Sequence, residues 1–375
     1  MLTIEQQYVL ELLRVAFELK QADEISEALD EDEVERMILH NGILLTVYPG
    51  LNPALQGRLF TLYAIRVSQA LTQALEGKQI QEKLNKAGLE SIGLKGWELQ
   101  RLYPKPSMRQ MADLDILVRP YCYEKIAILM KELEYSARGE SSWMHDNFKK
   151  DVILVEMHKR LTDDSNKVRD WERRMWERIS LGEDELLHMS LEDQTIFHVV
   201  HMYKDFMNGS LGLRRIVDTW LLHRQKMDLE VVTQELEAFG LKSFYNHMLH
   251  LGNVCMGEEE LDEDTTLLLE HAFQYGIYGS RKTYQMGRIV KMSGGSLRWG
   301  KIKSLIAAVF LPVSRMKAQF PTLERYPVLL PYYWLKRIIP FLHGDVKKSL
   351  RTLDYSNLTE DDFEEMQRFF RAGGC

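Results

Sequence analysis

Acidic side chains occupy one face of two strand-like segments. Asp113 and Asp115 lie two residues apart within 112–118, and Glu156 lies within 151–159. Because side chains alternate along a strand, these carboxylates share one face of each strand and apolar side chains take the other. Carboxylates held side by side repel each other, and a hard divalent cation with oxygen ligands is the simplest reason to keep them together. The pattern therefore predicts a divalent-cation site.

A glycine-containing turn precedes these carboxylates. Gly93, Lys95 and Gly96 end a strand expected over 90–95 and lead into a helix expected over 97–103. Exposed backbone N–H groups at such a turn suit phosphate oxygens, and Lys95 adds a positive charge. The alternative is an ordinary turn with Lys95 in solvent. Arg109, four residues before Asp113, has two interpretations: a phosphate contact, or a salt bridge that steadies the strand.

The order of these features resembles a known core. A Gly-containing strand-to-helix turn, an Asp-hydrophobic-Asp strand and a later acidic strand resemble nucleotidyltransferases of the polymerase-beta type. The chain also resembles a bacterial family of uncharacterised nucleotidyltransferases in three successive motifs: LKG, R-x-x-x-D-L-D-I-L-V and E-M-H. These motifs lie between Ile92 and Leu161. The wider superfamily usually has Gly-Ser at the turn, where this chain has Lys-Gly, so no hydroxyl is available there for a phosphate.

This resemblance implies a fold and a reaction. The expected fold is α+β, with a small mixed β-sheet core flanked by mainly helical N- and C-terminal parts. The expected reaction moves a nucleoside monophosphate from an NTP, such as ATP, to an unidentified acceptor (a small molecule, a protein or an RNA) and releases pyrophosphate. Asp113 and Asp115 would bridge two Mg²⁺ (or Mn²⁺) ions, and Glu156 would complete the site and help to take the acceptor proton.

Two alternatives stay open at this point. A metal-dependent glycosyltransferase also carries an Asp-x-Asp pair, but it would need a larger nucleotide-binding domain before that pair than the helical first 87 residues provide. A non-catalytic nucleotide- or nucleic-acid-binding module derived from the same fold would lack one carboxylate, whereas this chain has all three.

The chain is expected to divide into a helical region (1–87), the nucleotidyltransferase core (88–162) and a mainly helical C-terminal domain (163–375). The expected helices are 4–20, one through Met37 and Ile38, 53–84 with a break at Gly77, 121–134, 194–206 and 213–224. Besides the strands already given, one more is expected over 143–149, and none after Leu161. Residues 171–179 are expected as a surface helix or an extended edge.

Further polar residues are candidates for the acceptor side. His158 shares the face of Glu156, and His201 and Lys204 lie on the helix expected over 194–206. These residues, with Asp218, are candidates to contact an acceptor or nucleotide, or to hold a site residue in place through a structural hydrogen bond. His198, His201 and Asp205 share one helical face, which also permits a transition-metal site, although polar contacts at a helix–core boundary are commoner.

Charge is distributed unevenly along the chain. The net charge is −7, yet residues 281–353 hold 15 Lys or Arg against Glu324 and Asp345, a net of +13. This basic segment has four interpretations: a solvated face, or a contact with the phosphates of a nucleic acid, of a nucleotide or of a membrane surface. The three cysteines do not form a disulfide or zinc pattern, and no apolar run is long enough to cross a membrane, so a cytoplasmic location is expected.

Overall fold

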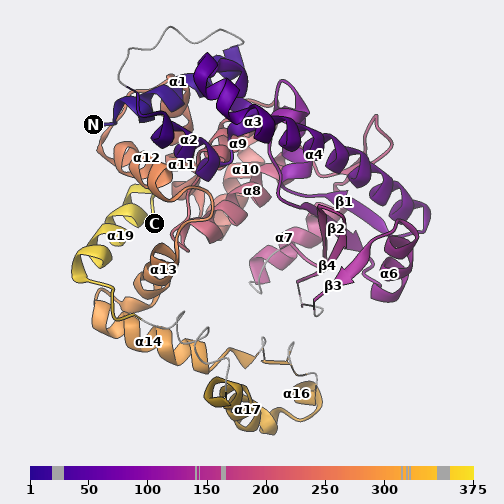
Figure 1. Ribbon diagram of the computed structural model, residues 1–375. Helices are drawn as coiled ribbons and strands as arrows, with labels where there is room; N and C mark the ends of the chain where they lie inside the picture. The colour runs from indigo at the N-terminus through magenta and orange to yellow at the C-terminus, as the bar shows by residue number, and fades with distance from the viewer. Residues whose placement is uncertain are drawn as a thin grey trace. The chain divides into compact units, whose positions relative to one another are not determined.

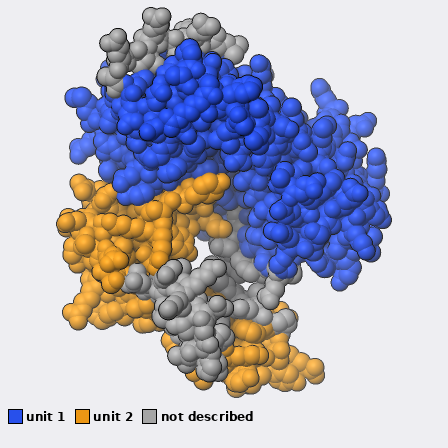
Figure 2. Space-filling model, in the orientation of Figure 1, with its two compact units in different colours: residues 1–203, 211–277, 373–375 blue, residues 204–210, 278–372 orange. Residues whose placement is uncertain are grey.

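The structure, a computed structural model, describes residues 1–18, 29–139, 142, 144–161, 166–313, 316–317, 320, 322–343 and 355–375. The chain forms two compact units (Figure 2). The first comprises residues 1–203, 211–277 and 373–375, and the second comprises 204–210 and 278–372. All the residues of the predicted cation site lie in the first unit.

The first unit begins with helices whose ends follow from local capping. The Asp30 side chain accepts hydrogen bonds from the N–H groups of Asp32 and Glu33 at the start of α2, and Gly42 ends that helix with a φ of 62°. Asn52 caps α4 in the same way, ahead of Pro53. The elements are α1 (Ile4–Glu18), α2 (Glu31–Asn41), α3 (Leu44–Val47), η1 (Tyr48–Gly50) and α4 (Pro53–Lys86).

These bounds confirm the helices predicted in this region, except that residues 19 and 20 lie outside the described residues. The predicted break at Gly77 is wrong, because α4 runs through it without interruption. Gly77 is present for packing instead. A Cβ atom at this position would lie 2.9 Å from the Trp97 ring, so only glycine lets the indole pack directly on the helix backbone.

A seven-stranded mixed sheet with strand order β3-β4-β5-β2-β1-β7-β6 confirms the α+β fold (Figure 1). β2 pairs with β5 and β1 with β7 in parallel, and the other neighbours are antiparallel. The strands are β1 (Glu90–Gly93), β2 (Leu114–Arg119), β3 (Ser136–Arg138), β4 (His145–Lys150), β5 (Ile153–His158), β6 (Ser180–Leu181) and β7 (Leu187–His188).

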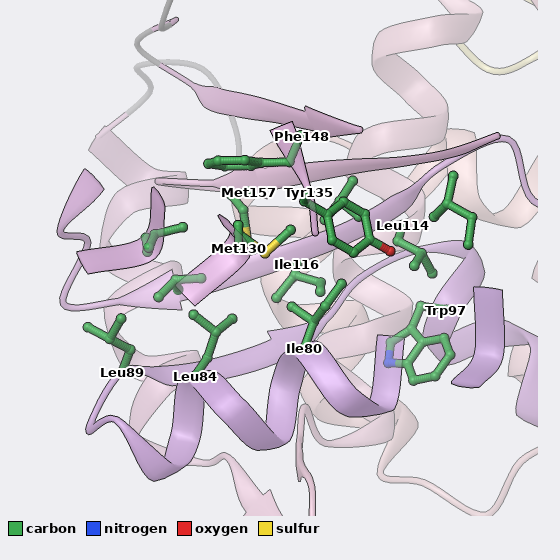
Figure 3. Close-up of a cluster of buried hydrophobic side chains, with 14 of the residues drawn as sticks. Ile80, Leu84, Leu89, Trp97, Leu114, Ile116, Met130, Tyr135, Phe148 and Met157 are labelled. Carbon is green, nitrogen blue, oxygen red and sulfur yellow. The ribbon is translucent and has the colours of Figure 1, made fainter. Parts of the chain in front are cut away.

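One face of this sheet packs on α4 and α6 (Tyr123–Glu132), and the cluster between them is almost fully buried (Figure 3). Burying one large aliphatic side chain contributes about 1.5 to 3 kcal/mol, so this face fixes the strands firmly. Alternation then directs Asp115 and Glu156 to the opposite face. The cluster includes Ile80, Leu84, Leu114, Ile116, Val118, Ile126, Met130, Phe148, Val155 and Met157.

The prediction that no strand follows Leu161 is wrong. Strands β6 and β7 follow Leu161, and β7 extends the sheet beside β1. Two-residue strands are too short to show alternation. α7 (Asn166–Glu177) confirms the surface helix predicted in this region, with Arg173 and Glu177 exposed on one face and Trp171 and Met175 fully buried on the other. Their four-residue spacing gives this charged helix one apolar face, and the Trp171 indole donates to Asp193 over 2.9 Å.

Helices make up the remaining described chain, and the predicted helices 194–206 and 213–224 are both present. These helices are α8 (Leu191–Phe206), α9 (Leu213–His223), α10 (Leu229–Phe239), α11 (Lys242–Met256) and α12 (Glu263–Tyr275), then α13 (Arg281–Ser293), α14 (Leu297–Val309), α16 (Thr322–Arg325), η4 (Pro327–Leu329), α17 (Leu330–His343) and α19 (Glu360–Ala372). Among the described residues, no helix has the length and apolar content of a membrane span.

The packing of Gly77 on Trp97 gives a stability prediction. We expect Gly77→Ala to lower the free energy of unfolding by about 1 to 3 kcal/mol, because the new methyl group overlaps the buried indole. Gly57→Ala, on the same helix with no atom within 4 Å of the new Cβ, should raise it by about 0.5 to 1 kcal/mol through helix propensity. Urea unfolding of both variants tests this, and stabilisation by both would contradict the packing role.

Candidate metal centre

Three carboxylates from two neighbouring strands meet at the face of the sheet opposite the apolar cluster. The parallel register of β2 and β5 sets Asp115 directly beside Glu156. Asp113 lies one residue before β2, which begins at Leu114 rather than at the predicted residue 112. One carboxylate oxygen from each of the three lies within 4.8 Å of the others. The structure therefore brings together all three carboxylates that the sequence selected.

Asp115 is buried and held by two nitrogen donors. Lys95 donates to its Oδ1 atom over 2.7 Å, and the Nε2 atom of His158 lies 2.8 Å from the same oxygen. Burial alone would raise the pKa of Asp115, but Lys95 and His158 outweigh it and lower that pKa well below its usual value. Asp115 is therefore ionised at neutral pH. Lys95 is directed at this carboxylate instead of into solvent.

Asp113 has the opposite environment. Its carboxylate accepts no hydrogen bond from any residue that the structure describes. Burial, followed by the negative charge of Asp115, raises the pKa of Asp113 from 3.8 to about 6. A largely buried anion without a partner, next to two further carboxylates, is unfavourable until a cation joins it. This donor set of oxygens fits Mg²⁺ or Mn²⁺.

Glu156 is flanked by two histidines. The Nε2 atom of His158 lies 3.4 Å from Glu156 Oε2, and that of His145 lies 3.7 Å from Oε1. The hydrogen bond from His158 lowers the pKa of Glu156 although burial opposes it, and burial lowers the pKa of His145. At neutral pH Glu156 is therefore charged and the His145 imidazole is neutral.

The sequence prediction did not select His145. It lies on β4, directly opposite His158 in the β4–β5 register, and so it shares the face of the carboxylates. The only sign in the sequence that His145 shares this face is its pairing with His158, and that pairing can be read only once the register of the β4–β5 hairpin is known. His145, Glu156 and His158 form a second group whose ligand atoms lie within 4.8 Å of one another.

The turn before α5 places Lys95. At Gly93 a Cβ atom would lie 1.7 Å from the Trp97 ring, so no other residue fits there. Lys95 has a φ of 48°, an unusual value for a residue with a side chain. The N–H of Leu94 donates to the backbone carbonyl of Asp115 over 2.9 Å, which ties the turn to β2. The helix predicted over 97–103 is shorter, comprising α5 (Gly96–Leu99) and the 3₁₀ turn η2 (Gln100–Leu102).

Arg109 is held in a buried ion pair with Asp218 of α9, the second of its two predicted arrangements. Its Nε and Nη2 atoms donate to the two Asp218 oxygens over 2.8 and 2.6 Å, and the Tyr103 hydroxyl donates to Oδ1 over 2.9 Å. A bidentate pair of this kind is directional as well as strong. It holds the segment before Asp113, which includes η3 (Pro106–Met108), against the helical part of the first unit.

The remaining candidates lie on α8. His201 contacts the Phe197 ring on α8, and Lys204 belongs to the second unit. His198 lies 2.9 Å from the Thr219 hydroxyl, and burial lowers its pKa to about 4, so it is neutral at neutral pH. Within the described residues, the potential ligand groups are the two around Glu156, and the helical His198, His201 and Asp205 are not among them.

Comparison with known proteins identifies one family. The model of a family described as uncharacterised nucleotidyltransferase matches residues 18–257. No curated protein and no solved structure matches the chain. The matched region contains the turn with Lys95, both carboxylate strands and the Arg109–Asp218 pair.

The pKa of Asp113 is raised and that of Asp115 is lowered, so replacing each by Asn should change the stability of the fold in opposite directions. Because the folded pKa of Asp113 is raised, its ionised form destabilises the metal-free fold, and this cost grows as pH rises from 3.8 to about 6. We expect Asp113→Asn to raise the free energy of unfolding by about 1 to 3 kcal/mol near pH 8 and to have little effect near pH 4. Denaturant unfolding across this pH range, in the presence of a chelator, measures the effect.

Asp115→Asn is the matched control on the same strand. It leaves Lys95 and His158 without their anionic partner and should lower the free energy of unfolding by about 1 to 3 kcal/mol near pH 8. Equal effects of the two substitutions would contradict the claim that the fold stabilises the ionised form of Asp115 and destabilises that of Asp113.

Proposed function

The chain belongs to the family of uncharacterised nucleotidyltransferases, and we propose that it transfers a nucleoside monophosphate from a nucleoside triphosphate to an acceptor hydroxyl, releasing pyrophosphate. In this reaction the acceptor oxygen forms a bond to the α-phosphorus and the bond to the pyrophosphate oxygen breaks. The family supports the general kind of reaction. The observation that carries the proposal is the meeting of Asp113, Asp115 and Glu156 beside a turn that presents Lys95.

We assign divalent metal binding to the three carboxylates. Asp113 supports this assignment most strongly, because it is a largely buried carboxylate to which no described residue donates a hydrogen bond, and its pKa is raised. Bound Mg²⁺ or Mn²⁺ would supply positive charge at the reacting phosphoryl group and the leaving pyrophosphate. The residues fit this role through oxygen donors on neighbouring strands, whose spacing is fixed by the β2–β5 register.

Lys95 has a role on the triphosphate side in this proposal. In the metal-free protein it neutralises Asp115. Once Asp115 is engaged by a cation, the ammonium group is available to a phosphate oxygen, and the backbone between Gly93 and Gly96 lies beside it. Gly93 and Gly96 let the backbone of this turn pack closely against its neighbours. A Cβ at Gly96, for example, would lie 2.6 Å from Arg109 Nη1. Arg109 acts as a positioning residue through Asp218.

We assign the acceptor side to Glu156, His145 and His158. A group that accepts the proton of a hydroxyl must be unprotonated at the working pH. His145 is neutral at neutral pH, and its Nε2 atom lies 3.7 Å from Glu156. His158 is largely buried and orients Asp115 and Glu156 through its Nε2 atom. His201 and Lys204 are not part of this assignment.

Transfer of an α-phosphate label tests the reaction. Each of the four nucleoside triphosphates, labelled at the α-phosphate, is incubated with the protein, Mg²⁺ or Mn²⁺ and cell extract as the acceptor source. We expect label to appear on one acceptor class, and Asp113→Asn or Glu156→Gln to reduce the rate at least about 100-fold, since each removes a charged ligand. Chelation should abolish transfer, and restored metal should recover it.

Asp151→Asn is the matched control for this assay. Asp151 is an exposed residue of the β4–β5 turn with a φ of 49°, a conformation that Asn also tolerates. Its substitution should leave transfer unchanged. Metal-dependent nucleotide binding without any transfer would favour the non-catalytic module, and equal transfer by the Asp113→Asn variant and the wild type would contradict the proposed metal ligands.

A further inference from the structure

Helix α14 of the second unit has two faces that are both poor in charge. One face packs on α13, where Gly300 approaches so closely that a Cβ would lie 2.7 Å from Ile289. Leu297 and Ser304 are buried on the same side. The opposite face carries Trp299, Ile302, Leu305 and Ile306, all exposed. A surface helix of a globular protein normally presents polar residues on this outer side.

Basic residues lie on both sides of this exposed stripe. Trp299, Ile302 and Ile306 follow at spacings of three and four residues and so share one helical face. At 100° per residue, Lys303 lies along one border of this face and Arg298 on its other side, between Ile302 and Leu305, and both basic residues are exposed. An apolar stripe bordered by Lys and Arg is the arrangement of helices that lie in the surface of a membrane.

A second exposed apolar cluster adjoins the end of α14. The Trp334 indole of α17 donates to the Leu311 carbonyl over 3.1 Å and packs edge-on against Phe310, with ring centroids 5.2 Å apart. Arg325 and Lys336 are exposed and lie over the rings of Tyr326 and Tyr333. The exposed apolar residues of this cluster are Phe310, Val313, Tyr326, Val328, Leu329, Tyr332 and Leu335.

We propose that the basic apolar surface formed by α14 and residues 326–335 binds the surface of an anionic lipid membrane. Charge complementarity supports this partner, because residues 281–353 carry a net charge of +13. The exposed aliphatic side chains distinguish it from nucleic acid, since Ile302, Ile306 and Val328 offer neither stacking nor hydrogen bonds to a base. The surface would bind peripherally, and the proposal does not depend on the reaction assigned to the first unit.

Vesicle binding by the full chain tests the proposal. Flotation with phosphatidylcholine vesicles that contain phosphatidylglycerol should recover the protein with the vesicles, and pure phosphatidylcholine vesicles should recover much less. Ile306→Glu should reduce partitioning roughly tenfold or more, because it puts a negative charge into the apolar stripe. Arg298→Gln with Lys303→Gln should reduce binding to the anionic vesicles roughly tenfold, and added salt should weaken it.

Ile65→Glu is the matched control. Ile65 lies on α4 in the first unit and is 57% exposed, against 53% for Ile306, so the two substitutions differ only in location. It should leave partitioning unchanged. Absence of binding to anionic vesicles, or equal loss with Ile65→Glu, would overturn the proposal. Binding of single-stranded RNA that is lost with Arg298→Gln and Lys303→Gln, without binding to anionic vesicles, would assign the surface to nucleic acid, and a dimer that Ile306→Glu dissociates would assign it to a second copy.

Discussion

Repulsion among three carboxylates is the constraint on which the rest of this site depends. Asp113, Asp115 and Glu156 lie within reach of one cation, and without compensation they would push β2 and β5 apart. The compensation is uneven. Asp115 is neutralised by Lys95 and His158, Glu156 is paired with His158, and Asp113 is left without a hydrogen-bond donor among the described residues. The metal-free protein thus keeps two carboxylates stable and leaves the third ready to gain a cation, a local loss of stability typical of functional sites.

The apolar side of the sheet makes this arrangement possible. Leu114 and Ile116 are fully buried on the side that faces α4, and their burial sets the parity that directs Asp115 outward. The Arg109–Asp218 pair anchors the chain four residues before Asp113. Trp97 joins the turn that carries Lys95 to α4, because its ring packs on Gly77 and its indole donates to Gln81 over 2.9 Å.

Local patterns in the sequence predicted much of this arrangement. Alternation along two strands was enough to select Asp113, Asp115 and Glu156, and helical spacing was enough to predict the long helix α4 from Pro53 onward. Features that depend on distant parts of the chain were not predictable. Arg109 and Asp218 are 109 residues apart, so sequence alone left two interpretations of Arg109 open. His145 needed the hairpin register, and β6 and β7 are too short to show alternation.

The most direct test of the central claim is the position of a bound metal ion. Crystals grown with Mn²⁺ and a non-hydrolysable nucleoside triphosphate analogue should show an anomalous difference peak in contact with the carboxylates of Asp113, Asp115 and Glu156, with Lys95 moved from Asp115 to a phosphate oxygen. An anomalous peak away from these three residues, or bound nucleotide with no peak among them, would contradict the claim that Asp113 completes a metal centre.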